Sequence, residues 1–447
     1  MMKYMLPYLS FFLHKAFKEY VSMWFFFFSF FLIFVSYFIN SFSFLMSGLY
    51  SGLFLLDFVS YILFILSIWL TVLLLMSSKG VRYGDKTLIF CYLCLLSMFF
   101  LMLVFFVDNV VFFYIFFELA SLPTLLFIIR FGYQPERWRA GVYLIMYTFF
   151  GSIPFFICLM WWMINGLDSM SFFFSYYSYY FSNFNMFFFI GCGLAFMVKL
   201  PIFGVHIWLP KAHVEAPISG SMLLAGLLLK LGGYGYIRFF SLFNCFMNFS
   251  GYYFSIGFIG GLFACFITFR QSDLKCFIAY SSVCHMSLIL GSLFTYNFIS
   301  VSGSMMMMFG HGLISCGMFC LASLYYDRLS SRSFYVLGGM SSFMVCGILL
   351  WFLILGLNMG LPPFFSFWSE MSLFMSVSSW WISGTWLVIM LSFQMAGVIN
   401  LFYFIGVSHG DSFSEKVNYE FKVREQVLLF MMIYPILMLF FMVSFFI

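Results

Sequence analysis

Seven ionisable residues stand inside long apolar runs of this sequence, where a charged side chain is costly. They are Asp57, Glu118, Lys199, Lys230, His285, His311 and Glu370. A charge at the centre of a membrane helix costs about 2.5–3.5 kcal/mol, so each residue requires a function or a partner. Removal from water disfavours the charged form of carboxyls and lysines alike, which brings proton exchange between them close to neutral pH. The set therefore predicts a proton pathway.

Several of these residues also have a structural interpretation. Glu118 could pair with a lysine and simply join two helices, and His285 and His311 could be hydrogen-bonded core histidines. A lysine near a helix end can extend to the interface, but Lys230 is too central in its run for that. Asp57 lies nearer the end of a run, and for it we expect an interfacial or structural role.

Proline interrupts two of the apolar segments, at residues 199–208 and 360–370. Both contain Leu-Pro, a phenylalanine two residues later and then a tryptophan, and they lie five segments apart. Proline removes a helix donor and clashes with the preceding turn, so each segment should be broken near the middle of the membrane. Paired broken helices indicate an inverted repeat and its working site. Lys199 opens the first interruption and Glu370 closes the second; His206, inside the first, is a further candidate.

The composition indicates an integral membrane protein. Hydrophobic residues make up 64% of the chain and charged residues 8%, and the mean hydropathy is +1.07. So little polar surface is incompatible with a water-soluble domain. Apolar runs long enough for a bilayer recur throughout the sequence. They lie near residues 4–13, 21–39, 53–76, 87–106, 110–130, 140–164, 186–209, 217–238, 251–269, 276–296, 303–325, 336–378, 384–405 and 427–446.

Basic residues occupy every second connection between these runs and account for 16 of the 20 Lys and Arg residues. Such alternation follows the positive-inside rule, and it appears only if 4–13 and 336–378 each cross once. The sequence therefore predicts fourteen crossings with both termini on the charge-poor side. The basic connections contain Lys15 and Lys18; Lys79, Arg82 and Lys86; Arg130, Arg137 and Arg139; Lys211; Arg270 and Lys275; Arg328 and Arg332; and Lys416, Lys422 and Arg424.

Other candidate sites carry weaker signals. His213 and Glu215 could suggest a metal, but they lack a third ligand in register, and a loop structure is the better interpretation. Cys91 and Cys94 form a C-x-x-C inside a hydrophobic run, which favours core packing. No basic cluster stands outside the membrane loops, which argues against nucleic acid. The 73 phenylalanines are typical of a T-rich genome and hence of an organelle gene.

A longer pattern of residues, covering about 105–375, resembles the antiporter-like membrane subunits of respiratory complex I. The run from 199 to 235 is the most specific part. A glutamate at position 370 and the length of the chain suit the chain 4 branch better than chains 2 and 5. The matching residues are 117–119, 134–137, 199–217, 229–235, 272–275, 279–282, His285, His311 and Gly312.

The resemblance implies an all-α polytopic fold of fourteen helices, with two inverted five-helix repeats and broken seventh and twelfth helices. Its parts would be residues 1–106, the halves 107–240 and 241–405, and a last part at 406–447. Glu118 and Lys199 would form the modulating pair of one half-channel. Protons would then pass along Lys230 and His285, with His311 continuing the path and Glu370 ending it. The family's Asn-Leu-x-Gly-Glu is here 366–370, so Glu370 is assigned by register alone.

The function implied is proton translocation in NADH:ubiquinone oxidoreductase of the mitochondrial inner membrane, with basic loops on the matrix side. NADH, FMN, iron–sulfur clusters and ubiquinone would bind partner subunits, since nothing here resembles a nucleotide loop or a cluster ligand set. Partners would be neighbouring antiporter-like chains and lipid. The alternative is a stand-alone or Mrp-type cation/proton antiporter. A haem-binding cytochrome lacks paired histidines, and a passive scaffold leaves the buried charges unexplained.

Overall fold

A computed structural model describes most of the chain, and the statements on structure below concern those residues. They are 49–50, 55–78, 87–132, 134–164, 186–239, 247–342, 344–381, 397–410, 420–441, 443 and 446. The predicted spans 4–13 and 21–39, the connection 165–185 and the first part of 384–405 lie outside the described residues. The prediction of fourteen crossings is therefore not tested as a whole.

Within the described residues the fold is almost entirely helical, which confirms the predicted class. Nine helices are long and apolar enough to cross a membrane, or ten if the bent pair Phe334–Ser342 and Val345–Asn358 counts as one span. Two shorter apolar helices, Phe189–Lys199 and Gly397–Ser408, add to these. A two-residue antiparallel hairpin, β1 (Leu49–Tyr50) with β2 (Leu55–Leu56), was not predicted.

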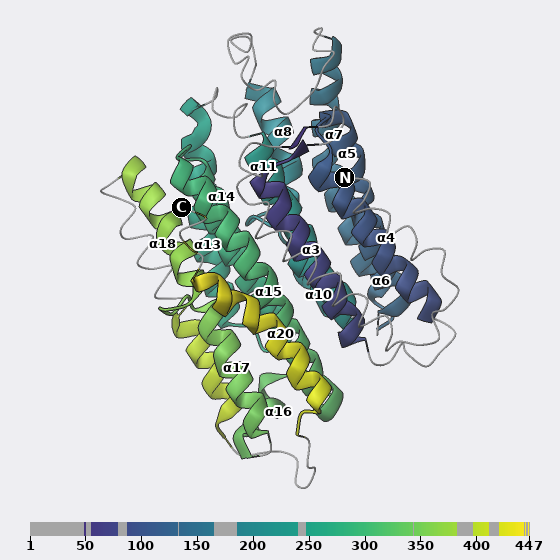
Figure 1. Ribbon diagram of the computed structural model, residues 1–447, viewed down its shortest axis with the longest axis vertical. Helices are drawn as coiled ribbons and strands as arrows, with labels where there is room; N and C mark the ends of the chain where they lie inside the picture. The colour runs from purple at the N-terminus through teal and green to yellow at the C-terminus, as the bar shows by residue number, and fades with distance from the viewer. Residues whose placement is uncertain are drawn as a thin grey trace.

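Figure 1 shows the longer helices running roughly along one axis. The helices are α3 (Phe58–Ser77), α4 (Thr87–Phe106), α5 (Val110–Leu119), α6 (Ser121–Phe131), α7 (Arg137–Ile164), α8 (Met186–Lys199), α9 (Trp208–Glu215), α10 (Ile218–Leu223), the π-helical turn η2 (Leu224–Leu228), α11 (Leu229–Arg238), α13 (Met247–Phe269), α14 (Leu274–Leu293), α15 (Phe298–Leu329), α16 (Phe334–Leu337), the 3-10 turn η3 (Met340–Ser342), α17 (Val345–Asn358), α18 (Phe365–Trp380) and α20 (Val423–Phe440).

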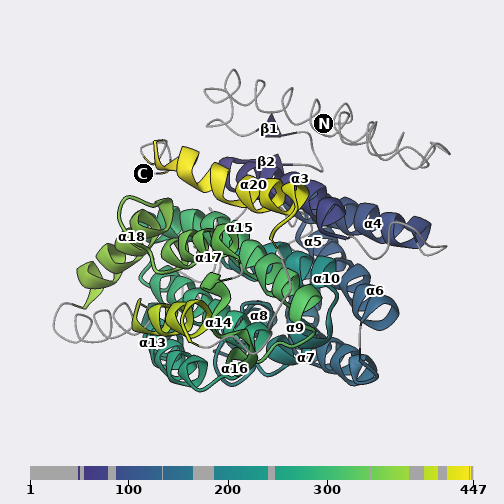
Figure 2. The same cartoon turned by 90° about the horizontal axis from the view of Figure 1, so that it is seen from below.

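The last helix covers an early one. Figure 2 shows α20 lying along α3 on one face of the bundle. The indole Nε1 of Trp69 donates a hydrogen bond to the carbonyl of Met431 at 3.0 Å. Hydroxyls inside the helices bond back to their own turns, as Ser67 does to Phe64 O at 2.6 Å. These side chains are thus hydrogen-bonded within the protein itself, as a bilayer core requires.

Connections that carry basic residues meet at one end of the bundle. The Lys275 ammonium donates to Val214 O at 3.3 Å and to Ala216 O at 3.0 Å. The Arg332 guanidinium reaches the same Val214 carbonyl at 3.0 Å, and Leu274 N–H donates to Arg332 O. Three of the predicted basic connections are therefore in direct contact, as alternate crossings require.

The segment 336–378 crosses the bundle once, as predicted. Its beginning is held at the basic end, where Phe334 N–H donates to Ser272 O. Its end lies at the opposite end, where the Asn297 amide donates to Ser379 Oγ at 2.7 Å. Ser272 comes just before the start of α14 and Asn297 just after its end, and α14 runs the length of the bundle. The two contacts therefore lie at opposite ends of the bundle. Helices α17 and α18 together form this broken span.

Both predicted breaks are present, and two further irregularities were not predicted. Residues 200–207 separate α8 from α9, and residues 359–364 separate α17 from α18. In addition, the helix is interrupted at Ala120, and η2 replaces regular α-helix between α10 and α11. In the order given, these four irregularities lie beside Lys199, Glu370, Glu118 and Lys230. Broken backbone at membrane depth is tolerated only inside protein or around a cavity, so it singles out these four places.

Close approach of α11 to α8 depends on Gly232. A Cβ added there would lie 2.7 Å from Leu200 N and 2.9 Å from Phe196 O, which are backbone atoms that cannot turn aside. We expect Gly232→Ala to destabilise the fold by about 1–3 kcal/mol through overpacking. The measurement is the amount of the chain in the membrane and its unfolding midpoint in mild detergent.

Gly406→Ala is the matched control, because an added Cβ meets nothing within 4 Å there. It should match the unchanged protein. If Gly232→Ala were as stable as this control, the tight α8–α11 contact would be wrong.

Candidate functional site

Glu118 and Lys199 form an ion pair between α5 and the end of α8. The Lys199 Nζ lies 3.9 Å from Glu118 Oε1 and 3.5 Å from the centre of the Phe117 ring. It also donates a hydrogen bond to the Phe117 carbonyl. Glu118 Oε1 is buried and has no hydrogen-bond partner among the described residues. The predicted pairing of these two residues is confirmed, and a shift of about 1 Å would make it a hydrogen bond.

Aromatic side chains pack beside Lys199, which is the more deeply buried member of this pair. Phe117 packs edge-on against Phe196, with ring centroids 5.7 Å apart, and Phe155 packs against Phe196 at 5.3 Å. All three side chains are fully buried. In such a low-dielectric environment the attraction between the two charges is stronger than it would be in water.

Lys230 is fully buried and contacts His311 directly. Its Nζ lies 3.0 Å from His311 Nδ1 and donates to Ala225 O at 2.5 Å. The π-helical turn η2 precedes it, and there Leu229 N–H bonds to Leu224 O, five residues back instead of four. This wider turn is what sequence reasoning missed, since no proline or glycine motif announces it. It sets the ammonium against both the helix backbone and α15.

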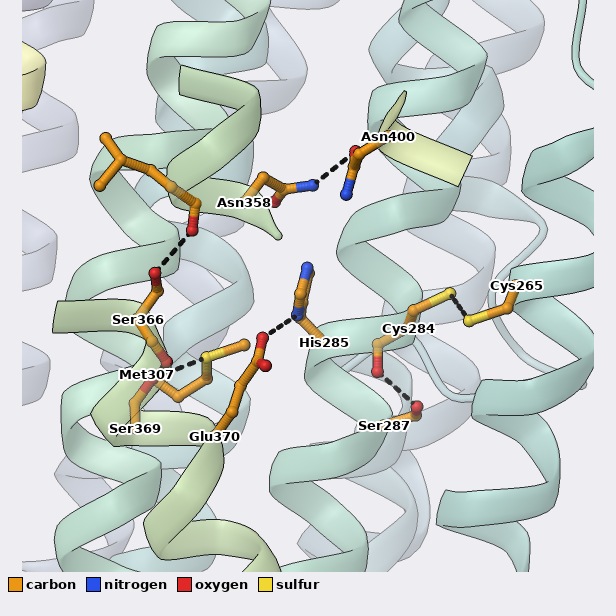
Figure 3. Close-up of polar contacts among 11 residues, drawn as sticks. Cys265, Cys284, His285, Ser287, Met307, Asn358, Ser366, Ser369, Glu370 and Asn400 are labelled. Carbon is orange, nitrogen blue, oxygen red and sulfur yellow. Dashed lines mark hydrogen bonds and ion pairs between the residues drawn. The ribbon is translucent and has the colours of Figure 1, made fainter. Parts of the chain in front are cut away.

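His285 links His311 to Glu370, as Figure 3 shows in part. The centroids of the two histidine rings are 5.4 Å apart, and His285 Nδ1 lies 3.8 Å from Glu370 Oε1. The order in space is therefore Lys230, His311, His285 and Glu370. The resemblance places His285 before His311, whereas the contacts in the structure run from Lys230 to His311 and then to His285, because η2 packs against α15.

Two buried amides beside this row were missed by the sequence reasoning. Asn358 Nδ2 donates to Asn400 Oδ1 at 3.2 Å, and Figure 3 shows Asn358 on the side of the His285 ring that lies away from Glu370. Both stand inside apolar runs, and Asn358 comes directly before the second break. A search for all polar residues in the runs, instead of ionisable ones alone, would have found them.

His206 lies inside the first break, away from the row. Its Nδ1 accepts a hydrogen bond from Gly204 N–H at 3.2 Å. Its ring stacks on Phe203 with centroids 5.0 Å apart and meets Tyr280 edge-on at 5.7 Å. None of the hydrogen bonds and ring contacts described here joins it to Lys199 or Lys230.

The remaining candidates occupy other places. Asp57 begins α3 and pairs with Arg238, which agrees with the structural role expected of it. His213 and Glu215 lie on helix α9, so the expected loop structure was wrong. The His213 ring stacks on Phe319 at 4.5 Å. Among the described residues, no three His, Cys, Asp or Glu side chains come together as a metal site would require.

Comparison with protein families gives two matches that together cover most of the chain. Residues 107–400 match the family described as NADH:quinone oxidoreductase/Mrp antiporter, TM. Residues 1–104 match NADH-ubiquinone oxidoreductase chain 4, amino terminus. All of the buried ionisable candidates except Asp57 fall within the first match.

Individual relatives belong to the same family as the second of these matches. The chain is 41% identical over 386 residues to NADH-ubiquinone oxidoreductase chain 4 of Ceratitis capitata, with 85% of each chain covered. It is 40% identical to chain 4 of Locusta migratoria, with 79% of each covered. Among solved structures, a chain of respiratory complex I from Thermus thermophilus with bound NADH covers 86% of this chain with a TM-score of 0.77. That chain is covered to 81% and is 22% identical, so this likeness concerns the fold alone.

Proposed function

The chain belongs to the NADH-ubiquinone oxidoreductase chain 4 family, and from that premise we propose that it conducts protons through its buried row of ionisable groups. This proposal rests on the row of Lys230, His311, His285 and Glu370, which joins α11, α15, α14 and α18. The Lys230 Nζ lies 3.0 Å from His311 Nδ1, the centroids of the two histidine rings are 5.4 Å apart, and His285 Nδ1 lies 3.8 Å from Glu370 Oε1. Groups that gain and lose protons at such spacing need only small movements to pass a proton along.

Each step of the row has a donor and an acceptor. The Lys230 ammonium gives a proton to His311 Nδ1 and is left as a neutral amine. The 5.4 Å between the two histidine rings is bridged by one water or by a small ring rotation. Closing the 3.8 Å between His285 Nδ1 and Glu370 Oε1 by about 1 Å makes a hydrogen bond for the last transfer.

The Glu118–Lys199 pair acts beside this row as its modulating element. Among the described residues Lys199 and Lys230 share no hydrogen bond or ion pair, so their coupling is electrostatic or runs through water. Opening the Glu118–Lys199 pair changes the local field and thereby the proton affinity of the row. His206 remains a further candidate at the break near Lys199.

Two contacts between ionisable side chains support a division into halves at 107–240 and 241–405. The Glu118–Lys199 pair, at 3.9 Å, lies in the first half, and the His285–Glu370 pair, at 3.8 Å, lies in the second. In each pair one partner borders a proline break. Figure 1 shows α5 to α8 on one side of the molecule and α13 to α18 on the other.

The membrane, the partner subunits and the orientation of the chain are inferred from its family. The chain sits in the mitochondrial inner membrane as a subunit of complex I, beside other antiporter-like subunits and lipid. The end where the basic connections meet faces the matrix, as the positive-inside rule requires. The chain itself holds no cofactor; NADH, FMN, iron–sulfur clusters and ubiquinone belong to partner subunits.

A native gel of mildly solubilised membranes tests the assignment. Stained for NADH dehydrogenase activity and probed for this chain, it should show the chain in a very large active band. Migration as a small inactive species would instead favour the stand-alone or Mrp-type antiporter, whose cation/proton exchange would then be sought in liposomes.

A further inference from the structure

Two buried thiols face each other between α13 and α14. The Sγ atoms of Cys265 and Cys284 lie 3.1 Å apart and share a hydrogen bond. The two residues are only 4% and 9% exposed, and neither is part of a disulfide. Figure 3 shows the two sulfur atoms together, with Cys284 pointing away from Glu370. The proton row does not use these thiols, so their contact requires a separate explanation.

The packing of the two helices determines this contact. Small residues recur at every fourth position of α13, at Gly257, Gly261 and Cys265. A Cβ added at Gly257 would lie 2.9 Å from the backbone N of Gly291, and one added at Gly261 would meet Ser287 Oγ. Small residues let helix backbones approach closely in a membrane. The next step along the same seam brings the two thiols together.

The distance between the two sulfur atoms is close to that of a disulfide. An S–S bond is about 2.03–2.05 Å long, so the atoms need to approach by about 1 Å from their present separation. A second sulfur contact, between Cys320 Sγ and Met222 Sδ at 3.2 Å, is similarly short. It offers no such bond, because a thioether has no hydrogen to lose. The pair on α13 and α14 therefore has both the distance and the chemistry for a disulfide.

The surroundings of the pair decide which oxidants act on it. Oxidation by a peroxide dissolved in water proceeds through the thiolate, and apolar surroundings disfavour that charged form. A radical that removes a hydrogen atom creates no charge, so an apolar environment does not hinder it. Phe263 and Phe266, which flank Cys265 in the sequence, are 52% and 54% exposed. Lipid around the chain therefore contacts α13 directly beside the thiols.

We propose that Cys265 and Cys284 are an oxidation site at which lipid peroxyl radicals close a disulfide inside the membrane. Each of two radicals takes one hydrogen atom from one thiol and becomes a lipid hydroperoxide. Two S–H bonds break and two O–H bonds form. The two sulfur radicals that remain pair to form one S–S bond. No ion is formed at any point, so the reaction balances without water.

The disulfide would also restrain one group of the proton row. Cys284 directly precedes His285, whose Nδ1 has to move about 1 Å closer to Glu370 Oε1 from its distance of 3.8 Å. A covalent bond from Cys284 to α13 opposes that movement. Because a misplacement of ~1 Å can cost up to about a hundredfold in rate, we expect turnover of the linked protein to fall about tenfold. This consequence rests on the proposed function, whereas the disulfide itself does not.

The test uses the assembled complex in sealed membrane vesicles that are treated with a lipid-soluble azo initiator, which generates peroxyl radicals in the bilayer. Peptides that contain Cys265 and Cys284 are then analysed by mass spectrometry before and after reduction with dithiothreitol. We expect a linked pair of peptides, lighter than their sum by the mass of two hydrogen atoms, which separates on reduction. Cys265→Ser should lose the link and keep normal turnover before treatment. Cys284→Ser replaces it if that variant does not assemble.

Cys346→Ser is the matched control, because Cys346 is an exposed thiol on a different helix, α17. It should form the link as the unchanged protein does. In the unchanged protein, Cys346 also reports whether the radicals reach the chain. Oxidation of Cys346 without any link between the other two thiols would overturn the proposal. Equal linkage by hydrogen peroxide in water would overturn the radical route.

Turnover after treatment separates the disulfide from its effect on the row, with Cys265→Ser giving the loss due to other damage. An additional loss in the unchanged protein that dithiothreitol reverses would support both. Linkage without that additional loss would leave the oxidation site in place and overturn the restraint on His285. Failure of the proton row itself would appear as normal pumping by Glu370→Gln, which has no influence on whether the link forms.

Discussion

Lys199→Met is expected to lower NADH:ubiquinone turnover and proton pumping at least about tenfold in a complex that still assembles. Positioned proton-transfer groups contribute about a hundredfold or more to rates, and Lys199 is the buried partner of Glu118 at 3.9 Å. Methionine has a similar length and can keep the contact with the Phe117 ring through its sulfur. The packing is therefore preserved while the exchangeable charge is lost.

Glu118→Gln should have an effect of similar size, and the double variant should be no worse than either single one. Residues that act as one unit are strongly non-additive, whereas independent contributions would add. Lys211→Met is the control, since Lys211 is exposed and lies over the Tyr143 ring, away from the ion pairs. A fully additive double variant would show that Glu118 and Lys199 do not act as a pair.

Lys230→Met is expected to cut coupled turnover and pumping about tenfold, because it removes the first group of the row. His311 Nδ1 then loses its partner at 3.0 Å. The measurement is proton uptake in sealed vesicles per assembled complex, with assembly judged on a native gel. Unchanged pumping in an assembled variant would remove Lys230 from the pathway.

Lys230→Arg distinguishes proton transfer from a fixed charge at this position. Arginine keeps the positive charge and hydrogen-bond donors but does not release a proton in proteins. If Lys230 carries protons, the arginine variant should be impaired about as much as Lys230→Met. Recovery with arginine would mean that the charge alone matters, as an anchor for His311 and the η2 turn.

The proline breaks show where sequence reasoning works. Proline has a local effect on its own helix, so Pro201 and Pro362 were sufficient to place both interruptions. The π-helical turn before Lys230 has no such proline marker. The break at Ala120 has one, Pro123, which the sequence reasoning did not use. The π-helical turn arises where the helix adjusts to its neighbours, and only the packed structure contains that information.

The two histidines of the row show where reasoning from the sequence fails. His285 and His311 were recognised as buried ionisable residues from the apolar runs around them, but the sequence did not show that Lys230 contacts His311 and not His285 first. The α-helical conformation of His213 was likewise taken for a loop. Asn358 and Asn400 were overlooked because a neutral amide is much cheaper to bury than a charge and stands out less.

The sequence by itself determined the membrane class, the crossing of 336–378, the two broken spans and the set of buried charges. Each of these follows from hydrophobicity along the chain, from local backbone chemistry, or from the charge of the connections. The tertiary structure decided which groups touch: Glu118 with Lys199, Lys230 with His311, His285 with Glu370, and Asn358 with Asn400. Such contacts join helices that are far apart in the chain. They depend on how side chains of neighbouring helices pack together, which no single stretch of sequence contains.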